Sequence, residues 1–156
     1  MSQQDFTGAR SIAYSVAAAL ANDPEVASVL WKAPKVFLDT IGPNVDFDDG
    51  APGMVVSAAS EDRVVRGDRT TQVGVVVFLD ASADPSSSTD SAQDDRGVYV
   101  LGCGGPLQRL VEEVVAAVER SEPGALLDNA AVEYDYGSSP VQFATVVFDF
   151  TQMDSF

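Results

Sequence analysis

Hydrophobic residues recur at helical spacing in two long segments of the chain. Residues 6–21 are rich in alanine and place Ile12, Val16, Ala19 and Leu20 on one face, which predicts a first helix. The segment after Gly105 repeats apolar residues at steps of three and one, and it predicts a second, strongly amphipathic helix. The apolar positions of that helix are Leu107, Leu110, Val111, Val114, Val115 and Val118.

A short additional helix is predicted directly after the first one. Asp23 is a residue type that caps helices, Pro24 suits the first helical position, and Glu25 suits the positive end of the helix dipole. We therefore expect a brief second helix or a kinked continuation of the first.

Strand patterns fill the middle of the chain. Residues 35–39 form a short candidate strand, and residues 54–61 and 70–82 predict two longer strands that flank a hairpin tip at 62–69. Within the second of these, residues 73–79 are apolar on both faces, which is typical of a central strand.

The remaining pattern predicts a loop, a strand and a closing hairpin. Residues 82–96 are rich in Ser and Asp without an apolar anchor, so we expect a mobile surface loop there. Residues 97–101 predict a strand. In the closing hairpin, Val132, Tyr134 and Tyr136 alternate with acids, residues 137–140 supply the turn, and residues 141–150 form the return strand with one face buried.

These elements together predict an α+β fold, with two main helices packed on an antiparallel sheet. The 156 residues suit one domain, and we expect residues 1–156 to form it, with the mobile loop at about 82–96. No apolar run approaches the roughly 18 residues that span a bilayer, so no membrane association is expected.

Composition narrows the function. The chain has 24 acids and 9 bases, a net charge of −15, and no histidine, so imidazole-based catalysis is excluded. The acidity disfavours a specific nucleic-acid site, since such sites need clustered Lys and Arg. A single cysteine, Cys103, excludes an internal disulfide and a zinc site built on cysteines. The acidic bias fits a high-salt host or GC-rich coding, and the composition does not separate the two.

Two motifs that suggest ligand sites fail on spacing. Gly102 and Gly104 lie between a strand and a helix, but the third glycine position of a dinucleotide fingerprint is Leu107, so a tight turn is the simpler interpretation. The acidic segment 46–50 holds Asp46, Asp48 and Asp49, yet its glycine comes one position too early for a calcium loop. We therefore expect no catalytic residue, no cofactor and no metal.

Positive charge concentrates at one hairpin. Arg63, Arg66 and Arg69 are a third of all basic residues, and they could contact an acidic neighbour such as a second copy of the protein. A solvated hairpin end explains them equally well. Trp31 is expected in the core or in a subunit interface.

The order of elements resembles the tail terminator, or tail-completion, family of tailed phages and related viruses. The resemblance covers residues 6–151 and is carried by "AAALANDPEVASVL", "APKVFLD", "TTQVGVVVFLD", "LQRLVEEVVAAVE" and "VQFATVVFDF". It is a match of pattern, without an invariant signature, and the Ser/Asp-rich loop and the acidity depart from it.

The resemblance implies a non-enzymatic virion protein, assembled in the host cytoplasm. Members of the family form a six-fold ring on the head-proximal end of the tail tube, so the implied partners are copies of the chain, the tail tube protein and a neck or head-completion protein. DNA would pass through such a ring without specific binding. Two alternatives remain open: a head-completion or neck adaptor protein, and a small acidic metal-binding domain using Asp46, Asp48 and Asp49.

Overall fold

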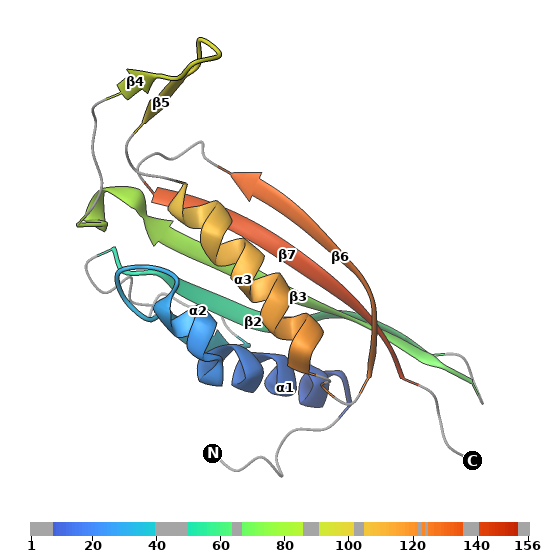
Figure 1. Cartoon of the computed structure of the whole chain (residues 1–156). Helices are drawn as coiled ribbons and strands as arrows, with labels where there is room; N and C mark the ends of the chain where they lie inside the picture. The colour runs from blue at the N-terminus through green and yellow to red at the C-terminus, as the bar shows by residue number, and fades with distance from the viewer. Residues whose placement is uncertain are drawn as a thin grey trace.

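The computed structural model describes residues 8–39, 50–63, 67–85, 91–101, 105–121, 123, 125–135 and 141–152. Three helices and seven strands follow one another in these residues, together with one short 3-10 turn (Figure 1). In chain order they are α1 (Gly8–Asn22), α2 (Pro24–Ser28), β1 (Lys35–Leu38), β2 (Gly53–Arg63), β3 (Arg69–Asp80), η2 (Ala81–Ala83), β4 (Ser91–Gln93), β5 (Tyr99–Leu101), α3 (Pro106–Ser121), β6 (Leu126–Asp135) and β7 (Val141–Gln152).

Five strands form the main sheet, in the order β1-β2-β3-β7-β6. The predicted α+β class is confirmed. The three pairings from β2 to β6 are antiparallel as expected, whereas β1 pairs with β2 in parallel, so the sheet is mixed. A parallel neighbour needs a longer connection than a hairpin turn, and the chain between Leu38 and Gly53 provides that length. The strand that is apolar on both faces, β3, lies at the centre as predicted.

The helices lie together on one side of the sheet (Figure 1). We call this the helix side, and the opposite side the open side. On the helix side, alternate residues of β3 and β7 are buried against α1 and α3, including Val73, Val75 and Val77 of β3 and Val146 and Phe148 of β7. The apolar stripe of α3 is buried as its spacing predicts, with Val115 only partly covered.

The start of α2 follows the predicted capping chemistry. The carboxylate of Asp23 accepts hydrogen bonds from the backbone N–H groups of Glu25, at 2.9 Å, and Val26, at 3.1 Å. Two of the N–H groups that have no partner at a helix start are thereby satisfied. The same carboxylate accepts a hydrogen bond from Arg120 of α3, at 2.8 Å, so the cap also joins two helices.

Strands β4 and β5 form a small second sheet, separate from the main one. Figure 1 shows this hairpin standing off the body, beyond the end of the main sheet where β7 begins. The predicted mobile surface loop over 82–96 contains regular structure at 82–83, which belong to η2, and at 91–93, which pair with 99–101, while residues 86–90 lie outside the described residues. The predicted strand at 97–101 is observed only at residues 99–101, as β5, and it does not join the main sheet.

No helix in the described residues is long and apolar enough to cross a membrane.

Candidate assembly surfaces

The β4–β5 hairpin is built by local turn chemistry. The carboxylate of Asp94 accepts hydrogen bonds from the backbone N–H groups of Arg96 and Val98, both at 2.9 Å, and the Asp94 N–H donates to the Val98 carbonyl at 2.8 Å. Gly97 closes the turn with a φ of +87°, a conformation that glycine adopts without strain. An aspartate at the start and a glycine at the left-handed position are typical of such turns, so this signal was available in the sequence.

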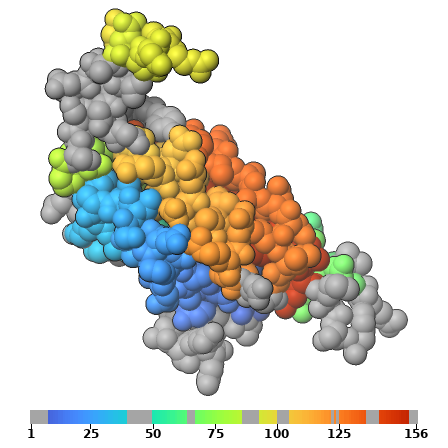
Figure 2. All heavy atoms as spheres, in the orientation of Figure 1, coloured from blue at the N-terminus to red at the C-terminus, as the bar shows by residue number. Residues whose placement is uncertain are grey.

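The same hairpin exposes apolar side chains. Val98 is 56% exposed and Tyr99 is 70% exposed, and every residue from 93 to 99 is exposed. Figure 2 shows the hairpin as a knob that projects from one end of the molecule. A two-stranded hairpin is marginally stable by itself in water, and an apolar surface that no core covers is typical of an interaction site. We call residues 91–101 the arm.

The predicted basic cluster is brought together in part. Arg63, the last residue of β2, lies opposite Arg69, the first residue of β3, in the register of the hairpin. The side chain of Arg63 also pairs with Glu61, with Nε and Oε1 2.6 Å apart, so part of its charge is compensated within β2. Arg66 lies outside the described residues.

Trp31 does not lie near these arginines. It is half-buried against the core and lines a hollow of about 210 Å³ with Asp84, Pro85 and Arg109. That hollow lies beyond the end of β3, whereas Arg69 begins this strand, and the 12 residues between the two ends span roughly 35–40 Å. Trp31 and the arginines therefore cannot belong to one compact patch. Whether either takes part in a subunit interface stays a prediction.

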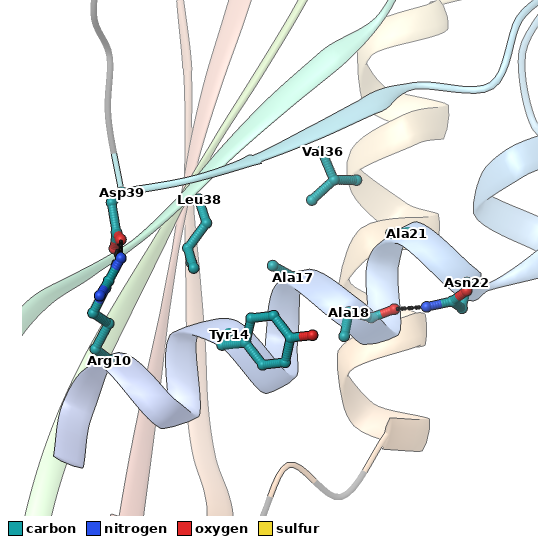
Figure 3. Close-up of a pocket in the computed structure, with 9 residues that line it drawn as sticks. All are labelled: Arg10, Tyr14, Ala17, Ala18, Ala21, Asn22, Val36, Leu38 and Asp39. Atoms are coloured by element: carbon teal, nitrogen blue, oxygen red, sulfur yellow. Dashed lines mark hydrogen bonds and ion pairs between the residues drawn. The ribbon is translucent and has the colours of Figure 1, made fainter. Parts of the chain in front are cut away.

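A groove runs between α1 and β1. It encloses about 380 Å³ and is open to solvent, and the small side chains of Ala17, Ala18 and Ala21 leave this room beside Val36 and Leu38 (Figure 3). Tyr14 and Asn22 also line the groove. One end of it is closed by an ion pair between Arg10 and Asp39, whose nearest atoms are 2.5 Å apart. We call this the α1–β1 groove.

A second hollow, of about 390 Å³, lies on the open side and is lined mainly by polar residues, Asp62, Asp128 and Asp149 among them. Asn129 donates to one carboxylate oxygen of Asp149 at 3.4 Å, and the other oxygen is buried without a hydrogen-bond partner. Within the described ranges, however, no three Asp, Glu, His or Cys side chains come close enough to hold a metal ion. The predicted alternative metal ligands Asp46, Asp48 and Asp49 lie outside those ranges, as does Cys103.

One ion pair, between Asp23 and Arg120, shifts the pKa values of both partners away from their ordinary values. The hydrogen bond from Arg120 lowers the pKa of Asp23, opposed in part by burial, and the backbone donors of α2 lower it further. The pKa of Arg120 is raised, mainly by the same hydrogen bond from its guanidinium to Asp23. This pair joins α2 to α3 and has a structural role.

No known protein family has a model that matches this chain, and no curated protein matches it. The resemblance to tail terminators therefore stays a prediction.

Two features that pattern reasoning missed are the arm and the exposure of β6. The alternation in β6 suggested one buried face, yet Val132 is 40% exposed and Tyr134 is 38% exposed. Both lie on the helix side of the sheet, but α3 packs on β3 and β7 and does not cover them. An alternating pattern marks which side of a strand is apolar, and only the position of the helices decides whether that side is covered.

Proposed function

We propose that this chain is a tail terminator, a virion protein whose copies form a ring that caps the head-proximal end of a tail tube and joins it to the neck. The order of elements suggests the family, and the structural observation that carries the assembly role is the arm, although its residues 91–96 belong to the loop that departs from the family's pattern. A short hairpin held away from the body, with Val98 and Tyr99 in solvent, gains little from its own chain and much from burial against another protein. Such a device suits an assembly protein.

The position of the arm supports contact with the next component of a virion. Figure 1 shows the arm beyond the end of the main sheet where β7 begins. If copies stand side by side around an axis that follows the strands, the arms of all copies lie at the same end of the ring. Contacts between copies would then use the lateral surfaces, and the arms would be left to bind the tail tube protein.

The net charge is compatible with a channel for DNA. Each copy carries a formal charge of −15, so the wall of a ring would repel the phosphates of passing DNA and would not bind them. Passage without sticking is what a terminator requires, and no step in this role makes or breaks a covalent bond.

The test is capping of tube growth. Purified full-length protein is added to tail tube protein of the same virus during polymerisation, and tube lengths are measured by negative-stain electron microscopy. We expect shorter tubes that carry a ring at one end. Tubes of unchanged length without bound protein would contradict the proposal, and retention on a portal or neck protein column instead would favour the neck adaptor alternative.

Two variants separate the arm from general surface apolarity. The substitution Tyr99→Ser in the arm should abolish most of the capping, because an exposed aromatic side chain is a typical anchor of a protein interface. The control is Ala27→Ser, since Ala27 is an exposed apolar residue of α2 that lies outside the arm and outside both edge strands. Equal loss of capping in both variants would contradict a specific role for the arm.

A further inference from the structure

The two edge strands of the main sheet differ in character. β1 ends the sheet on one side and β6 ends it on the other, and among the described strands each pairs with a single neighbour. The outer N–H and C=O groups of an edge strand are a template for another strand. β6 offers ten residues for this purpose, and almost all of them are exposed.

On the helix side, both edges present apolar side chains. Val36 and Leu38 of β1 lie beside Met54 and Val56, and they line the α1–β1 groove. On β6, Val132 and Tyr134 lie opposite Val146 and Ala144 in the register, so they point to the same side of the sheet. One edge therefore carries an apolar groove, and the other carries exposed apolar side chains.

On the open side, the two edges carry opposite charges. Lys35 of β1 lies beside Gly53, which places it on the open side, and it is exposed. Glu133 and Asp135 of β6 lie opposite Thr145 and Phe143 on that same side. The only two lysines of the chain, Lys32 and Lys35, are at or next to β1, whereas the charged residues of β6 are all acids.

From this match we infer that β6 of one copy pairs with β1 of the next copy, so that the main sheet continues from one subunit to another. In a continued sheet, side chains on the helix side of one copy meet side chains on the helix side of the next, because the side chains of every strand alternate with a period of two. Val132 and Tyr134 then enter the α1–β1 groove of the neighbour, and Glu133 and Asp135 approach its Lys35. The inference rests on the proposed ring and names the surfaces that close it.

The geometry favours a ring over a two-fold dimer. One parallel pairing and three antiparallel pairings separate β1 from β6, so β6 runs opposite to β1. If copies are related by rotation about an axis along the strands, β6 of one copy therefore meets β1 of the next as an antiparallel pair. Such a contact uses different surfaces on the two copies, and it closes when the rotations complete a circle. A dimer through two β6 edges would instead bring Glu133 and Asp135 of the two copies against each other, which is unfavourable.

A charge swap tests the inference. Association of the full chain is measured by sedimentation velocity for the wild type, Lys35→Glu, Glu133→Lys and the double variant. Each single reversal should weaken association at least tenfold, because it places like charges at the joint, and the double variant should recover most of the loss. The control Glu119→Lys changes the net charge as much as Glu133→Lys does, and its exposed site lies on α3, which packs on β3 and β7 and on neither edge strand. It should associate at least as well as the wild type.

The outcomes separate this inference from the proposed function. Wild-type rings that persist in both single variants, or a double variant as weak as the single ones, would overturn the edge pairing and leave the ring standing. A wild type that stays monomeric under every salt condition and does not cap tubes would overturn both. Circular dichroism of each variant confirms that the exposed substitutions leave the fold intact.

Discussion

The ring of Phe78 lies against Gly53, directly opposite it on the neighbouring strand. A Cβ added at Gly53 would approach two ring atoms of Phe78 to 2.6 Å, closer than real Cβ contacts come. Phe78 is only 3% exposed although it lies on the open side, so its ring has little space to move aside. The absence of a side chain at Gly53 therefore leaves room for the ring of Phe78, and any larger residue at position 53 would push this ring aside.

The first prediction concerns this contact. Gly53→Ala should destabilise the protein by about 1–3 kcal/mol, because the methyl group overpacks a buried site. Urea unfolding followed by circular dichroism measures the change. In the control Gly74→Ala, the nearest atom to the new methyl group is 4.0 Å away, so stability should hardly change. Equal stability of the two variants would contradict the contact.

The second prediction concerns pH and Asp23. Because the pKa of Asp23 is lowered from its ordinary value of 3.8, its ionised form stabilises the fold fully at pH values above 3.8. That contribution is lost as the pH falls through the lowered pKa. Asp23→Asn keeps a capping side chain but removes the charge, so the variant should lose less stability than the wild type between pH 5 and pH 2.

Unfolding midpoints in urea across that pH range measure this difference. Asp23→Ala removes both cap and charge and should cost about 1 kcal/mol at pH 7. If the unfolding midpoints of the wild type and of Asp23→Asn fell in parallel as the pH is lowered, the pair with Arg120 would not change the pKa of Asp23.

The third prediction tests the helix side of the core. Leu110 of α3 is fully buried, and Leu110→Ala should cost about 2–5 kcal/mol through lost burial and a new cavity. Glu119→Ala, at an exposed position of the same helix, should change stability by less than about 0.5 kcal/mol. Thermal denaturation compares the two, and similar melting temperatures would contradict the assigned face of α3.

The fourth prediction separates the arm from the body. Gly97→Val forces a β-branched residue into a positive φ and should unfold the arm. Because the arm forms its own sheet, the melting temperature of the body should stay unchanged while amide protection of residues 93–99 is lost. Hydrogen exchange read by NMR measures the amide protection, and thermal denaturation followed by circular dichroism measures the melting temperature. A lowered melting temperature would show that the arm stabilises the body.

The sequence could predict the elements whose signals are local. The cap at Asp23, the apolar stripe of α3 and the central position of β3 all follow from residue types at fixed spacing. The parallel pairing of β1 could not be predicted, since strand direction at an edge depends on how the connecting chain returns. The arm was missed because two three-residue strands leave little periodicity, although the Asp94–Gly97 turn was visible.

The candidate surfaces were harder to predict than the fold. Arg63 and Arg69 could be placed together because they flank one hairpin. The sequence pattern could not show that Trp31 lies far from these two arginines, because the distance between them depends on which end of the β2–β3 hairpin α2 lies against. The match between Lys35 and Glu133 depends on the strand order, since these residues belong to opposite edges of one sheet.

The central claim is that the chain acts by assembling into a ring, and its mass in solution tests that claim most directly. Multi-angle light scattering on a size-exclusion column measures this mass at a series of salt concentrations. The added salt screens the repulsion between copies of charge −15. The account predicts a discrete species of about 98 kDa, six times the 16.4 kDa chain, that becomes dominant as salt is raised. A single species of 16.4 kDa at every salt concentration, with tail tube protein present or absent, would contradict it.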